Sequence, residues 1–90
     1  MFFGLFGGKK EKELGRVVHY FDKIQVAVLE LYGNLSVGDK IKVARGEAEF
    51  TQSVDSMQID HQDVKSAGKG QEVAIKVAQP AKAGTRVYKA

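Results

Sequence analysis

The sequence predicts an all-β domain, a small closed antiparallel barrel of six strands over residues 14–90, preceded by a flexible tail over residues 1–13. Runs of alternating apolar residues recur about every 8 to 14 residues, and Gly, Asn and Asp stand between them. Only one stretch could hold a helical turn. Closure into a barrel is favoured because it removes exposed sheet edges, which benefits a 90-residue chain without cysteine and with only a modest core.

The first two strands are predicted to form a hairpin. Residues 17–21 and 24–31 are rich in β-branched and aromatic side chains, and Asp22-Lys23 joins them. Val26 and Val28 lie on the face opposite to the one that carries Ala27, Leu29 and Leu31. Because both faces are partly apolar, we expect this strand in the centre of a sheet or in a closed barrel.

The next segment consists of two turns and a strand. Gly33-Asn34 and Gly38-Asp39 favour tight turns. Leu35 and Val37 share one face between the turns, and we expect them to plug one end of the barrel. In residues 40–45 Ile41 and Val43 are predicted to face inward, as in a half-buried strand.

The remaining strands are less regular. Phe50, Gln52 and Val54 share a face, after which Met57 shifts the phase and suggests a β-bulge. Residues 61–71 read as a polar loop with one helical turn. The last two strands, at residues 72–78 and 85–90, are joined through Pro80, and these side chains are expected inside them: Val73, Ile75, Val77 and Val87.

Four sequence segments carry a resemblance to a known family: "GNLSVGDKI", "SVDSMQ", "VKSAGKGQEVAIKV" and "GTRVYK". Together they resemble the second, β-barrel domain of translational GTPases such as elongation factor Tu and initiation factor two, over residues 14–90. The chain also resembles the accessory barrel appended to collagenase-like peptidases. The matched positions are mostly turn glycines and core aliphatics, so they support the fold more than the function. With no GTPase domain, the chain alone is not expected to bind GTP.

The translation-factor resemblance implies a non-enzymatic binding module that contacts ribosomal RNA or tRNA. The formal charge is +3, and residues 65–90 contain six bases against one acid. A basic face can follow a phosphate backbone, although solvated strand exteriors explain the same charges. Tyr20, Tyr32 and Tyr88 could stack on bases or pack over a barrel end. The predicted nucleic-acid-binding residues are Lys40, Lys42, Arg45, Lys65, Lys69, Lys76, Arg86 and Lys89.

The tail, "MFFGLFGGKK", supports an alternative function. Phe2, Phe3, Leu5 and Phe6 could dock on a partner protein or a membrane surface, which would make the chain a protein-interaction adaptor. The glycine and lysine spacing does not match a phosphate-binding loop. A signal peptide is disfavoured because the lysines follow the apolar residues.

The sequence offers weak signals for chemistry. No run approaches the ~20 apolar residues of a membrane span, and no cysteine is present, so a cytoplasmic location is expected. Asp60-His61-Gln62-Asp63 could offer metal ligands, but a zinc site needs three or four convergent donors. Ser53 and Ser56 lack the turn that frames a catalytic serine. We therefore expect no catalytic residue, cofactor or metal.

Overall fold

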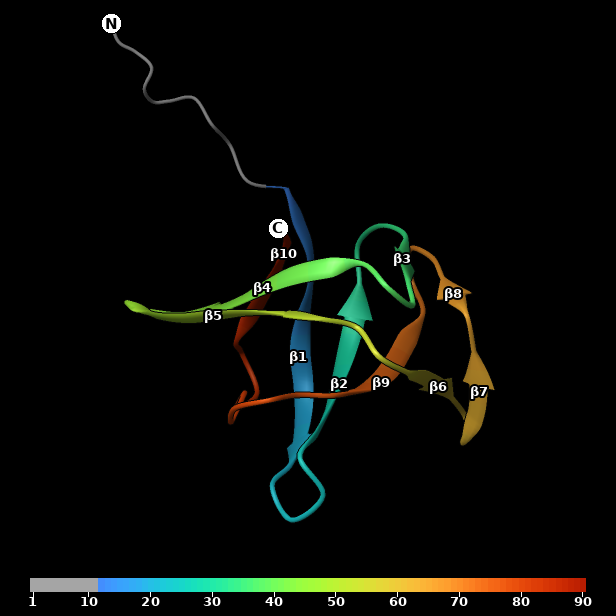
Figure 1. Ribbon diagram of the computed structural model, residues 1–90, viewed down its shortest axis with the longest axis horizontal. Coiled ribbons are helices and arrows are strands. Elements are labelled where there is room, and N and C mark those ends of the chain that lie inside the picture. The colour runs from blue at the N-terminus through green and yellow to red at the C-terminus, as the bar shows by residue number, and fades with distance from the viewer. Residues whose placement is uncertain (1–11) are drawn as a thin grey trace, which may run out of the picture.

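The computed structural model describes residues 12–90, which form antiparallel β-structure (Figure 1). Eight strands make one sheet in the order β5-β4-β10-β1-β2-β9-β6-β7, and β3 pairs with β8. The strands are β1 (Glu13–Phe21), β2 (Val26–Leu31), β3 (Leu35–Ser36), β4 (Lys40–Arg45), β5 (Ala48–Ser53), β6 (Met57–Ile59), β7 (Gln62–Val64), β8 (Ser66–Ala67), β9 (Glu72–Lys76) and β10 (Arg86–Lys89). The all-β prediction is confirmed.

The sheet curls around its core, so that β4 and β5 run across β1 and β2 (Figure 1). Strand β2 shows how the sequence sets the curl: Ala27, Leu29 and Leu31 are at most 1% exposed, while Val26 and Val28 between them are half-buried on the outer face. The period-two predictions hold elsewhere too. These side chains are buried as expected: Ile41, Val43, Val73, Ile75, Val77 and Val87.

The prediction of a closed six-stranded barrel is wrong. The eight-stranded sheet is not closed, because β5 and β7 stand at its two edges. Where β5 faces the end of β9, a side chain takes the place of a ladder. The Gln52 amide donates to the Lys76 carbonyl oxygen at 2.9 Å, and its own oxygen accepts from the Ala78 backbone N–H at 2.8 Å. We call the opening between β5 and residues 76–85 the seam.

Several local predictions need correction. Residues 61–71 contain β7 and β8 rather than a helical turn. Asp60 and His61, with φ of 51° and 66°, form the tight turn between β6 and β7. Met57 changes phase because the strand is interrupted between β5 and β6, and the bulges lie in β1 instead.

The prediction that Leu35 and Val37 together cover one end of the barrel is half right. Leu35, which pairs with Ala67 in the β3–β8 ladder, is fully buried, but Val37 is 41% exposed. Val37 fails because its N–H donates to the Lys65 carbonyl oxygen, which ties this residue to the surface segment after β7. The first hairpin is confirmed, with β2 starting at Val26 rather than Ile24.

Residues 12–90 contain no helix long and apolar enough to cross a membrane. The predicted partner-binding side chains of the tail, Phe2, Phe3, Leu5 and Phe6, lie outside the described residues.

Candidate functional site

The outer face of β2 and β9 carries an apolar groove with a volume of about 480 Å³. Val26 and Val28 of β2 and Ala74 of β9 form its floor, and Val28 and Ala74 are paired in the ladder. Phe21 and Ile24, from the end and the turn of the β1–β2 hairpin, stand at one side and are 50% and 60% exposed. We call this surface the outer groove.

The rim of the outer groove is polar and acidic. Asp60 and His61 reach it from the β6–β7 turn, Glu72 from the start of β9, and Gln58 from β6. The side chain of Gln58 donates to the Asp63 carboxylate at 3.0 Å. An apolar floor with a negative rim suits an apolar protein segment flanked by positive charge.

The predicted nucleic-acid-binding residues separate into two groups. Five lie on the adjacent strands β4 and β10: Lys40, Lys42, Arg45, Arg86 and Lys89. The other three lie around β7 to β9: Lys65 between β7 and β8, Lys69 in the turn after β8, and Lys76 at the end of β9. In the sheet order, β1 and β2 stand between β10, which carries Arg86 and Lys89, and β9, which carries Lys76.

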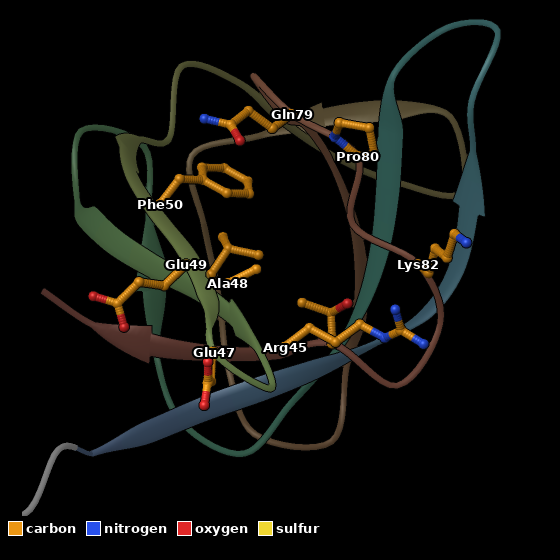
Figure 2. Close-up of a pocket in the computed structure, with 10 residues that line it drawn as sticks. Arg45, Glu47, Ala48, Glu49, Phe50, Gln79, Pro80 and Lys82 are labelled. Carbon is orange, nitrogen blue, oxygen red and sulfur yellow. The ribbon is translucent and has the colours of Figure 1, made fainter.

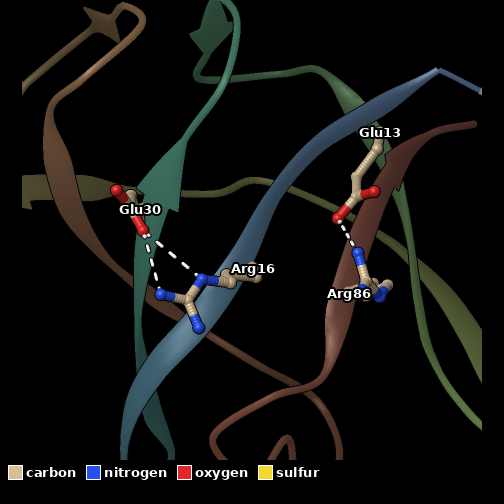
Figure 3. Close-up of polar contacts among 4 residues, drawn as sticks. All are labelled: Glu13, Arg16, Glu30 and Arg86. Atoms are coloured by element: carbon tan, nitrogen blue, oxygen red, sulfur yellow. Dashed lines mark hydrogen bonds and ion pairs between the residues drawn. The ribbon is translucent and has the colours of Figure 1, made fainter.

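Some of the basic side chains on β4 and β10 are paired with carboxylates. Arg86 binds Glu13 at 2.7 Å across the β1–β10 ladder (Figure 3). This hydrogen bond, together with the carboxylate charge, raises the pKa of Arg86 above its ordinary value. Lys42 lies 3.9 Å from Glu49 and 5.5 Å from the centre of the Tyr88 ring. On the neighbouring ladder, Arg16 similarly pairs with Glu30 at 3.3 Å (Figure 3).

The tyrosines and the weak catalytic signals do not converge on one site. Tyr20 packs against the core, whereas Tyr32 is 41% exposed after β2. Within residues 12–90, no group of three or more His, Asp or Glu side chains could hold a metal ion. Ser53 ends β5 and Ser56 precedes β6, while Asp63 is engaged by Gln58.

Sequence comparison finds a peptidase relative. The chain is 40% identical over 77 residues to the uncharacterized protease MJ0090 of Methanocaldococcus jannaschii. The match covers 84% of this chain but 19% of that protein, so the chain spans about a fifth of the curated relative's length. No family model matches the chain.

Solved structures show the same fold. Two crystal structures of the C-terminal domain of a protein assigned to the U32 peptidases, from Geobacillus thermoleovorans, superpose with a TM-score of 0.82 at 20% identity. They cover 87% and 94% of this chain and 99% and 98% of their own chains.

The sequence interpretation missed the outer groove. Its signal was present in the two apolar faces of β2, but a second apolar face was attributed to a closed barrel rather than to a binding surface. The comparisons also overturn the functional interpretation. The resemblance to domain two of translational GTPases, and the RNA-binding module inferred from it, are wrong, because the relatives found are a protease and U32 peptidase C-terminal domains.

Proposed function

We propose that this chain is a non-catalytic accessory domain that docks on the catalytic part of a U32-type peptidase. The observation that carries the proposal is the 40% identity to about a fifth of a protease some five times longer. We infer that a segment of that kind contacts the rest of the longer protein. The chemistry would then belong to the partner, and this chain would supply a docking surface.

The outer groove is the surface best suited to that contact. Phe21 and Ile24 are the two most exposed large apolar side chains among residues 12–90. They stand next to the apolar floor made by Val26, Val28 and Ala74. Fully burying an exposed large apolar side chain is worth roughly 1.5–3 kcal/mol, and about half of each of these two remains to be buried. The acidic rim adds selectivity for a positively charged surround.

Docking is tested by titrating the labelled full chain with the M. jannaschii protease from which its 77 matched residues have been removed. We expect saturable binding in fluorescence anisotropy. The double variant Phe21→Ser/Ile24→Ser should weaken it at least about tenfold, because two anchors of the interface are removed. Both positions are exposed, so the fold should be retained.

Val37→Ser is the matched control, because Val37 is also an exposed apolar residue but does not line the outer groove. It should bind like the unchanged chain. A second format joins the two parts covalently, with this chain replacing the matched segment of the protease. One cooperative unfolding transition that splits in two with the double variant supports docking. Independent transitions in the unchanged chimera would refute it.

A further inference from the structure

The seam contains a hollow with a volume of about 500 Å³ (Figure 2). Its walls come from the β4–β5 hairpin on one side and from residues 79–85 on the other. Gln52 closes the seam at one end through its bonds to Lys76 and Ala78. The hollow begins where that bridge stops, so it marks the part of the sheet that remains unclosed.

Strand β5 presents a free backbone edge there. It is the terminal strand of the eight-stranded sheet and pairs with β4 alone. Apart from that ladder, no backbone hydrogen bond within the described part of the chain involves residues 48–51. In an antiparallel strand, alternate residues direct their N–H and C=O groups away from the neighbour. These groups are available to another strand.

Apolar side chains from both walls line the hollow beside this edge. Phe50 projects from β5 toward the side where Pro80 and Gln79 lie (Figure 2), and Val43 and Ala48 complete the apolar lining. Phe50 also packs against the hydrophobic core, so its position is fixed. A strand added to β5 would place alternate side chains over this surface.

Two cations stand where the hollow opens. Arg45 extends from the end of β4 toward the loop that carries Lys82 (Figure 2). Neither makes an ion pair or a side-chain hydrogen bond with any residue in 12–90. The carboxylates of Glu47 and Glu49 point away from them in this view. Thr85, 2% exposed, also lines the hollow, and its hydroxyl has no hydrogen-bond partner among residues 12–90.

We propose that the seam binds an extended peptide, which adds to the free edge of β5 and places an acidic side chain between Arg45 and Lys82. Main-chain hydrogen bonds to residues 48–51 hold the peptide, and its apolar side chains pack on Phe50 and Pro80. Four strand positions span roughly 13 Å. The site lies on other elements than Phe21 and Ile24 and does not depend on docking at the outer groove.

In the test, the full chain is immobilised and exposed to a random pool of peptides. Each peptide is about six residues long and blocked at both ends. Sequencing the bound fraction should show enrichment of Asp or Glu next to apolar residues. With Arg45→Glu/Lys82→Glu, the preference should reverse to Lys and Arg, and an acidic peptide should bind at least about tenfold more weakly. Both side chains are exposed, so charge reversal leaves the core intact.

Amide exchange measured by NMR supplies the second readout. A bound peptide should slow exchange at alternate residues within 48–51, and methylating alternate peptide nitrogens should abolish this protection. Lys69→Glu is the control, because Lys69 lies outside the seam. Capture without sequence preference, an acidic preference that survives the double reversal, or unchanged exchange in β5 would each overturn the proposal.

Discussion

Replacing Gln52 by alanine should loosen the seam while leaving the strands on both sides in place. The side chain makes two hydrogen bonds across the opening, at 2.9 Å to the Lys76 carbonyl oxygen and 2.8 Å from the Ala78 N–H. A typical intramolecular hydrogen bond contributes about 0.5–1.5 kcal/mol net to the stability of the fold. Lys76 and Ala78 are exposed, so water can replace part of the loss. We expect the free energy of unfolding to fall by about 1–2 kcal/mol.

For a domain of this size, 1 kcal/mol corresponds to roughly 4–8 °C in the midpoint of thermal unfolding. The variant should therefore melt about 4–16 °C lower, as followed by circular dichroism. Exchange of the Ala78 amide gives a local measure, because that N–H loses its acceptor. It should exchange faster, while amides in the β1–β2 ladder keep the rate set by global unfolding.

Gln58→Ala is the matched control. Gln58 is also a strand glutamine with a side-chain hydrogen bond, but its partner is Asp63 within the β6–β7 hairpin. It should change stability by less than about 0.5 kcal/mol. The reasoning fails if the two variants are equally stable, or if the Ala78 amide exchanges no faster in Gln52→Ala, since either result means that the seam is not held by this side chain.

Three further substitutions test the core and the backbone, each by urea denaturation. Thr85→Val removes a buried hydroxyl without a partner and should stabilise the fold by about 1–2 kcal/mol; a loss of stability would show that the hydroxyl is bonded. Gly15→Ala should destabilise by about 1–3 kcal/mol, because its Cβ would meet the backbone carbonyl oxygen of Glu30; a neutral effect would mean that β1 and β2 separate easily. Leu35→Ala should cost about 2.7–5.0 kcal/mol, and an effect as small as that of Val37→Ala would show that β3 does not cover the core.

The parts of the fold that the sequence predicts are those with one buried face. Ile41 and Val43 alternate with polar residues, and a slip of one position would expose both, so the pattern determines which face of the strand is buried. The same rule accounts for Val73 and Ile75 in β9. Alternation describes each strand by itself, however, and does not state which strand pairs with which.

Closure was mispredicted for that reason. β5 meets the end of β9 through the side chain of Gln52 and not through a backbone ladder. This contact joins Gln52 to Lys76 and to Ala78, which lie 24 and 26 positions away in the sequence. The β6–β7 turn was missed because Asp60-His61 lacks the glycine usual in two-residue turns with positive φ. In the candidate site, charge alone could not separate Arg45 and Lys82, which share a hollow, from Arg86, which is paired with Glu13.

Strand β9 contributes to both the outer groove and the seam. Whether binding at one surface affects binding at the other can therefore be measured. Ala74 of β9 forms part of the groove floor, and Lys76, at the end of the same strand, accepts the bond from Gln52 that closes the seam. The interior side chains of β9, Val73 and Ile75, are at most 1% exposed, so the core holds this strand in place. A strand held in a single arrangement offers no second state whose population either surface could shift. Phe21→Ser/Ile24→Ser should therefore leave peptide capture unchanged, and Arg45→Glu/Lys82→Glu should leave docking unchanged. If either double variant alters both docking and peptide capture, β9 couples the two surfaces. Gln52→Ala should then reduce that coupling.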